Sequence, residues 1–177
     1  MLIKTVFAGF GGQGVLSMGL NLAQAGMLEG KYVTYLPAYG AEVRGGTANC
    51  TISISDEEIA SPVAASPTYV VAMNQPSMVR FQNKIQAGGV LFLNSSLTQE
   101  TVSRGDIEIV NVPANAVAEK MGNVKSANMI MLGAFIKKTN LVNLQSLIDG
   151  LAVALKGNQK LIKINKEALS AGYELAL

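Results

Sequence analysis

The sequence predicts an α/β protein with three α/β/α layers around a Rossmann-like, mostly parallel sheet that carries an antiparallel edge hairpin. Short continuous apolar runs alternate with segments that have helical apolar periodicity, which is typical of a parallel sheet covered by helices. A glycine-rich turn joins the first apolar run to the first helical segment. The chain has 177 residues, which suits a single domain over residues 1–177.

The elements follow one another along the chain with turn residues between them. Helix Gln13–Glu29 is closed by Gly30, and Pro76 stands where a first helical residue is favoured. The strands are expected at Leu2–Ala8, Tyr32–Leu36, Thr47–Ser55, Tyr69–Met73, Val90–Leu93 and Ile107–Val110. The further helices are expected at Ser77–Ile85, Ala114–Met121, Ala127–Lys138, Leu144–Lys156 and Lys166–Glu174.

Segment Thr47–Ser55 alternates strictly between polar and apolar residues. Such alternation indicates a strand that is half exposed or lies at an edge of the sheet. We expect Ile59 to begin its hairpin partner, beyond the turn at Asp56–Glu58.

Segment 127–136 is apolar almost all round, whereas a surface helix should show a polar face. It lies either at the centre of the core or against another protein. The core is favoured, because a chain of this length can enclose one such helix.

The turn from Gly9 to Gly14 places glycines at the spacing GxGxxG, through Gly9, Gly11 and Gly14. In a dinucleotide site such a turn brings backbone N–H groups to a phosphate at a helix N-terminus. The acidic residue that would bind the ribose is missing, because the second strand runs into Pro37 and Ala38. The glycines therefore serve either phosphate binding or close packing of helix on strand.

Four polar loops follow the predicted strands, and ligands of open α/β sheets bind beyond the carboxyl ends of strands. They are Gly9–Gly14, Pro37–Thr47, Asn74-Gln75 and Asn94–Ser96. In the second loop Arg44 precedes Gly45, Gly46 and Thr47, a combination suited to holding a phosphate or carboxylate, or to an ion pair with Glu42 or another chain. The amides of Asn74 and Gln75 suit either a helix cap or a ligand.

The composition removes several classes of chemistry. The chain has no histidine and one cysteine, Cys50, so histidine-based triads, a cysteine zinc site and a self-contained iron–sulfur cluster are excluded. We expect no catalytic residue and no metal ligand on this chain. The net charge of +2 does not indicate nucleic-acid binding, and Lys156, Lys160 and Lys163 are interpreted as one solvated helix face.

No apolar run reaches the length of a membrane span, so we expect a cytoplasmic protein without membrane contact. Charged residues make up only 15% of the chain. This low fraction indicates either a core rich in glycine and alanine or a surface covered by other subunits.

Three motifs occur in order along the chain: Gly9–Val15, Tyr39–Cys50 and Ala72–Pro76. Together they resemble the gamma subunit of 2-oxoacid:ferredoxin (acceptor) oxidoreductases, most closely the 2-oxoglutarate type. The gamma domain of pyruvate:ferredoxin oxidoreductase belongs to the same family. The resemblance extends to about Lys138, and residues 139–177 carry no signature.

The resemblance implies a complex that decarboxylates a 2-oxoacid oxidatively, forms acyl-coenzyme A and reduces ferredoxin or a related acceptor. It implies alpha and beta subunits and a ferredoxin-like delta subunit as partners. Thiamine diphosphate, Mg and the iron–sulfur clusters would lie on those partners, so this chain alone is expected to bind no cofactor and to have no turnover.

The residues expected to contact a coenzyme A phosphate or a neighbouring subunit are Gly9, Gly11, Gly12, Gln13, Gly14, Arg44, Gly45, Gly46, Thr47, Asn74 and Gln75. The alternative is an independent nucleotide-binding protein, or an NAD(P)-type enzyme, that uses the glycine-rich turn by itself.

Overall fold

The computed structural model describes residues 1–39, 46–99 and 102–176, without the side chain of Tyr39. These residues form a six-stranded sheet in the order β2-β3-β1-β4-β5-β6. Strands β1, β4, β5 and β6 are parallel to their neighbours in that series, whereas β3 is antiparallel to both β1 and β2. The strands are β1 (Leu2–Phe10), β2 (Tyr32–Tyr39), β3 (Thr47–Ser55), β4 (Tyr69–Ala72), β5 (Val90–Asn94) and β6 (Glu108–Val112).

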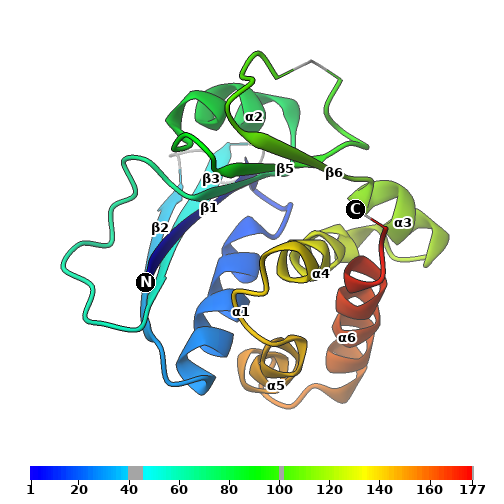
Figure 1. Cartoon of the computed structure of the whole chain (residues 1–177). Coiled ribbons are helices and arrows are strands. Elements are labelled where there is room, and N and C mark those ends of the chain that lie inside the picture. The colour runs from blue at the N-terminus through cyan, green and yellow to red at the C-terminus, as the bar shows by residue number, and fades with distance from the viewer. Residues whose placement is uncertain (40–45, 100–101, 177) are drawn as a thin grey trace.

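Helices cover both faces of the sheet unequally, and the predicted three-layer fold is confirmed. Figure 1 shows α1, α4, α5 and α6 together below the sheet and α2 alone above it. The helices are α1 (Val15–Leu28), α2 (Gln75–Phe81), α3 (Ala114–Lys120), α4 (Ala127–Thr139), α5 (Leu144–Ala154) and α6 (Gln159–Tyr173), with 3₁₀ turns η1 (Gln82–Lys84) and η2 (Val124–Ser126). The hydrophobic core is correspondingly split into a large cluster on the α4 side and a small one under α2.

Helix α4 lies in the core, as its sequence predicts. Its residues from Met129 to Ile136 are all buried, and Phe135 stacks edge-on against the rings of Phe7 and Phe92 from the sheet. Its opposite side packs on α6. A helix enclosed by sheet and helices needs no polar face, which explains its uniform apolarity.

Strand β3 corrects one prediction. It is an internal strand, and its antiparallel partners are β2 and β1, so the hairpin at the sheet edge is β2–β3. No strand begins at Ile59, because residues 56–68 run as an irregular arm. The alternation has a different cause: Cys50, Ile52 and Ile54 are buried in the large cluster with α1, whereas the polar residues between them lie on the opposite face of the sheet.

The C-terminal helices correct a second prediction. Helix α5 ends at Ala154 and α6 begins at Gln159, so the last helix is longer than expected. Lys156 lies in the turn between them with φ of 48°, and it does not share a helix face with Lys160 and Lys163. A helical apolar spacing that continues across a turn conceals that turn from a periodicity argument.

Candidate functional site

The glycine turn lies at the carboxyl end of β1 and opens α1. Gly12 and Gly14 adopt φ of 97° and 72°, the left-handed region that favours glycine. Gly14 is the N-cap of α1, and no side chain caps that helix. The first turn also contains no acidic residue, so no side chain of that turn offsets the positive end of the helix dipole.

Packing accounts for two of the glycines. A Cβ at Gly9 would lie 2.8 Å from both Gln13 Oε1 and Val15 Cγ1, and a Cβ at Gly14 would overlap the amide of Asn128. Gly12 is different, because nothing lies within 4 Å of the position that its Cβ would take. Close packing therefore explains Gly9 and Gly14, and it leaves Gly12 as an exposed backbone position.

Gln13 ties the turn to the neighbouring strand. Its Oε1 accepts hydrogen bonds from the backbone N–H of Phe10 and from Asn74 Nδ2, both at 2.7 Å, and its Nε2 donates to the carbonyl of Met73 at 3.3 Å. Asn74 is buried and caps α2, since its Oδ1 accepts from the N–H of Ser77 at 3.0 Å. The structure thus gives Asn74 the capping role and also links it to the glycine turn.

Further asparagines extend this amide network, and sequence reasoning did not single out two of them. Asn94 is fully buried, and its Nδ2 donates to Met73 O at 3.2 Å and to Asn115 Oδ1 at 2.7 Å. Asn128 Nδ2 donates to Gly14 O at 3.3 Å. Asn115 and Asn128 lie in the first turns of α3 and α4, and a lone asparagine within the apolar segment 127–136 was the available signal.

The end of the loop that follows β2, at Gly46 and Thr47, contacts the glycine turn. The N–H of Gly11 donates to the carbonyl of Gly46 at 2.9 Å, and Thr47 stands opposite Phe10 in the β1–β3 register. Arg44 and Gly45 lie outside the described residues. Gln75 is turned to another segment, since its Oε1 accepts from the N–H of Gln99 at 3.0 Å.

Two hollows flank Gly12. One of about 210 Å³ is lined by Gly12, Gln13, Met73, Asn115, Val124, Lys125 and Ala127. The other, of about 220 Å³, is lined by Phe10, Gly11, Gly12, Gly14, Val15, Leu16 and Ala48. Each is smaller than the roughly 300–1,000 Å³ of a complete ligand pocket, so each suits one part of a larger molecule.

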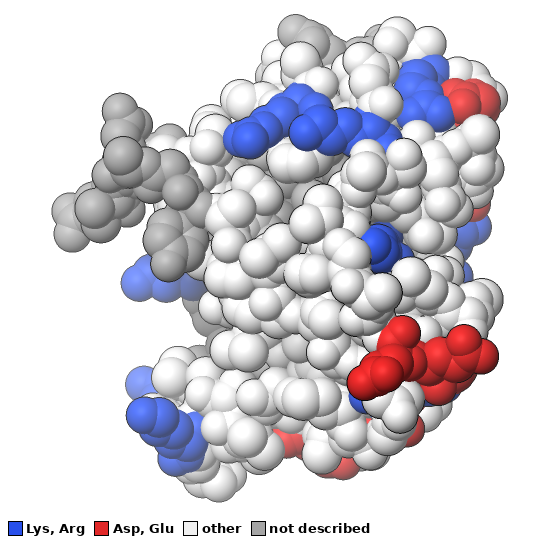
Figure 2. All heavy atoms as spheres, turned by 90° about the vertical axis from the view of Figure 1, so that its left-hand side faces the viewer, with Lys and Arg blue, Asp and Glu red and all other residues white. Residues whose placement is uncertain are grey.

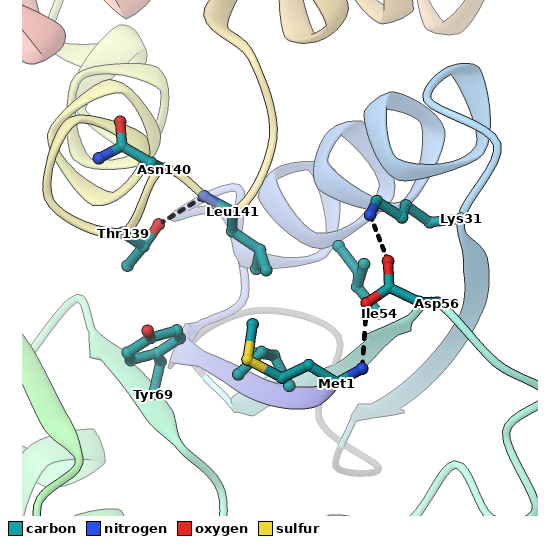
Figure 3. A pocket seen from close by; sticks show the side chains of 9 residues that line it. Met1, Lys31, Ile54, Asp56, Tyr69, Thr139, Asn140 and Leu141 are labelled. Atoms are coloured by element: carbon teal, nitrogen blue, oxygen red, sulfur yellow. Dashed lines mark hydrogen bonds and ion pairs between the residues drawn. The ribbon is translucent and has the colours of Figure 1, made fainter.

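A third hollow of about 200 Å³ lies at the opposite end of β1 (Figure 3). There the Asp56 carboxylate is paired with Lys31 and with the amino group of Met1. These two partners lower the pKa of Asp56 to about 2. Both carboxylate oxygens are occupied by these contacts, and the hollow is remote from the glycine turn.

The sheet order bears directly on dinucleotide binding. In a dinucleotide-binding domain the acidic residue after the second strand stands beside the glycine turn of the first. Here antiparallel β3 lies between β1 and β2, which separates their ends by roughly 10 Å instead of about 5 Å. The fold and site therefore define an α/β domain with an open glycine turn that lacks the second half of a dinucleotide site.

Comparison with known proteins identifies the family of this domain. The chain belongs to the pyruvate ferredoxin/flavodoxin oxidoreductase family, whose model matches residues 4–175. It is 40% identical over 98% of its length to the ketoisovalerate oxidoreductase subunit VorA of Methanothermobacter thermautotrophicus, and it spans about a third (36%) of that relative. It is 33% identical to the 2-oxoglutarate synthase subunit KorC of Methanothermobacter marburgensis, with 96% of this chain and 94% of that one covered.

Solved structures agree on the fold. The gamma subunit of a keto/oxoacid ferredoxin oxidoreductase from Geobacter sulfurreducens superposes with a TM-score of 0.83 at 24% identity, over 97% of this chain and 96% of that one. A 2-oxoglutarate:ferredoxin oxidoreductase from Magnetococcus marinus, solved with 2-oxoglutarate, coenzyme A and succinyl-CoA, gives 0.89 at 23% identity, over 97% of this chain and 30% of that one. The resemblance to gamma subunits is confirmed, whereas the 2-oxoglutarate type is not singled out, because identity is higher to the ketoisovalerate relative.

Three further observations concern the described residues. Among residues 1–39, 46–99 and 102–176, no three His, Cys, Asp or Glu side chains gather as a metal site would require. In the same ranges no helix is long and apolar enough to cross a membrane. The thiol of Cys50 is buried, and burial raises its pKa to about 12.

Proposed function

We propose that this chain is the gamma subunit of a thiamine-diphosphate-dependent 2-oxoacid:ferredoxin oxidoreductase. The complex would decarboxylate a 2-oxoacid oxidatively and join the acyl group to coenzyme A. Its two electrons would pass through iron–sulfur clusters to ferredoxin or a related acceptor. Family membership over residues 4–175 is the observation that carries this proposal.

The partners in this proposal are alpha and beta subunits and a ferredoxin-like delta subunit. Thiamine diphosphate, Mg and the clusters would be held by these partners. This division is supported by the single cysteine of the chain, Cys50, which is buried and cannot by itself ligate an iron–sulfur cluster. Affinity purification of the tagged chain from its native host tests the assembly: the thiamine-diphosphate subunit should copurify, and recovery of a free monomer only would contradict it.

The role proposed for the chain is to form one wall of a coenzyme A site. Gly12 supports it, because its backbone is open on both sides and lies at an uncapped helix N-terminus, where phosphate is favoured. Lys125 lines the same hollow and would add a positive charge. When bound, coenzyme A supplies the thiol that accepts the acyl group. The chain's own residues would hold the phosphate end of the molecule.

A matched pair of glycine variants tests this role. Gly12 and Gly30 both have positive φ and no atom within 4 Å of an added Cβ, so an alanine at either position is strained in its backbone and not crowded by neighbours. In the assembled complex, Gly12→Ala should raise the KM for coenzyme A several-fold and leave the KM for the 2-oxoacid unchanged. Gly30→Ala should change neither value. Equal behaviour of the two variants would overturn the coenzyme A contact while leaving the subunit assignment intact.

Arg44→Ala tests the loop that lies outside the described residues. If this arginine helps to hold coenzyme A, the variant complex should assemble normally and show a raised KM for coenzyme A. Full activity at a low concentration of coenzyme A would show that the loop acts as a scaffold without holding coenzyme A.

The 2-oxoacid itself is expected to be 2-oxoglutarate on the motif resemblance, and the ketoisovalerate relative makes a branched-chain 2-oxoacid the competing substrate. Measuring kcat/KM of the purified complex for 2-oxoglutarate, 2-oxoisovalerate and pyruvate decides between them.

The competing function is an independent nucleotide-binding protein. Calorimetric titration of the isolated chain with NAD, NADP, FAD, ATP and coenzyme A tests it. Micromolar binding of a dinucleotide would favour that function. The position of β3 between β1 and β2 argues against it.

A further inference from the structure

Asn128 is the one residue with a polar side chain in segment 127–136 of helix α4. Helices α1 and α4 lie side by side on the same face of the sheet (Figure 1). From the first turn of α4, Asn128 reaches the glycine turn, where its Nδ2 donates to the carbonyl of Gly14 at 3.3 Å. An amide in a part-buried, apolar segment is costly unless it is hydrogen-bonded, so this contact accounts for the asparagine.

Gly14 and Asn128 are fitted to each other. A Cβ on Gly14 would overlap the Asn128 amide, so that amide fills the place of any side chain at position 14. The carbonyl of Gly14 also accepts the N–H of Met18 at 3.0 Å, which is the first hydrogen bond of α1. Asn128 therefore holds the residue at which the glycine turn becomes a helix.

Gly12 lies between anchored residues and makes no hydrogen bond with any described residue. Before it, the N–H of Gly11 donates to the carbonyl of Gly46 at 2.9 Å. After it, Gln13 bonds to the residues that follow β4, and Gly14 bonds to α4. A glycine backbone has wide conformational freedom, so the direction of the Gly12 N–H is set by the anchors on its two sides.

We propose that Asn128 is a positioning residue for coenzyme A: it fixes Gly14, and through Gly14 it fixes the backbone of Gly12 that would meet a phosphate. This inference rests on the proposed coenzyme A site and adds α4 to it. Among the anchors that the described residues provide, Asn128 is the one from the C-terminal half of the chain. Because α4 packs on α6, the last helices thereby support the glycine turn.

The test uses the assembled complex, because other subunits are expected to cover part of this chain. Most of the face shown in Figure 2 carries no charged side chain, and only 15% of all residues are charged. Binding of coenzyme A to the complex is measured by calorimetric titration without 2-oxoacid, so that no turnover occurs.

Asn128→Leu keeps the approximate size of the side chain and removes its donor. It should raise the dissociation constant of coenzyme A about three- to tenfold and leave the KM for the 2-oxoacid unchanged. Asn128→Ala removes the same donor without adding an apolar branch, and it should give the same result. Circular dichroism of each variant chain checks that it folds.

Asn165→Leu is the matched control. The Nδ2 of Asn165 also donates to a backbone carbonyl, that of Leu161 at 2.9 Å, but it does so within α6. Its replacement removes the same kind of bond away from the glycine turn, and it should leave both constants unchanged. An equal rise in the dissociation constant for Asn128→Leu and Asn165→Leu would overturn the positioning role.

The double variant Gly12→Ala with Asn128→Leu tests whether Asn128 acts through Gly12. Once Gly12 is altered, loss of the Asn128 bond should weaken binding by less than it does in the unmodified complex, whereas fully additive effects would overturn the positioning role. Weaker binding in Gly12→Ala but not in either Asn128 variant would overturn that role alone. Unchanged binding in Gly12→Ala would overturn the proposed coenzyme A contact as well.

Discussion

At the scale of single residues, Gln13 organises the candidate site. Its one amide oxygen accepts from both Phe10 and Asn74, so it fixes the glycine turn against the start of α2. Removing it leaves two part-buried donors without their acceptor, which costs about 1–3 kcal/mol. We expect Gln13→Ala to lower the free energy of unfolding by that amount in urea denaturation.

The control for this prediction is Gln145→Ala. Gln145 is on the exposed side of α5 and bonds only to Asp149 in the described structure, so the change should stay within about 0.5 kcal/mol. Equal effects of the two variants would show that the Gln13 bonds do not hold the turn.

Cys50 gives a residue-scale prediction for alkaline pH. Burial raises its pKa from 9.0 to about 12, so the unfolded chain loses the thiol proton before the folded chain does. Its contribution to stability is complete below pH 9 and is lost as pH rises from 9 towards 12, by about 1.4 kcal/mol per pH unit.

The Cys50→Ala variant should therefore lose stability less steeply than the unmodified chain across that range, as measured by denaturation at several pH values. At pH 8 the native thiol should also react with a disulfide reagent about a thousandfold more slowly than the unfolded chain. Equally fast labelling of folded and unfolded chain would contradict the buried position.

At the scale of elements, α4 and α6 pack through glycines. A Cβ at Gly172 would overlap the carbonyl of Ile130, and one at Gly133 would overlap the carbonyl of Leu169. Backbone atoms cannot move aside as side chains do, so the helices would have to separate. We expect Gly172→Ala to destabilise the fold by about 2–4 kcal/mol in thermal or urea unfolding.

Gly150 of α5 provides the matched variant. It is also a buried helical glycine, but an added Cβ there would find its nearest neighbour at 3.5 Å. Gly150→Ala should be neutral or stabilise by up to about 1 kcal/mol through helix propensity. If both variants destabilised alike, helix approach would not be the reason for the glycine at 172.

Element type was predictable where the apolar pattern was strong, as in α4 and β5. Which strands pair with each other was not predictable. Strand β3 would show the same alternation at an edge of the sheet, with its polar side in solvent, as it does inside the sheet, with that side against an irregular arm. The places of Gly12, Asn74 and Asn94 in the candidate site were predictable, because each lies at or just after the carboxyl end of a strand. Asn115 and Asn128 arrive from later helices, so only the folded chain brings them to the turn.

At the scale of the whole molecule, the domain has a glycine turn without a partner acid and hollows too small for a complete cofactor. Its sheet also inserts β3 where a dinucleotide site requires adjacent strands. These features, with family membership, support a chain that completes the site of a larger oxidoreductase. They do not support one that turns over alone.

Reconstitution of the complex tests most directly whether this chain is needed for activity and is inactive by itself. The subunits are purified separately, and viologen reduction dependent on both 2-oxoacid and coenzyme A is followed with this chain added or omitted. The account predicts no turnover by the chain alone, low activity when it is omitted and full activity when it is restored. Undiminished activity without the chain, or turnover by the chain by itself, would contradict it.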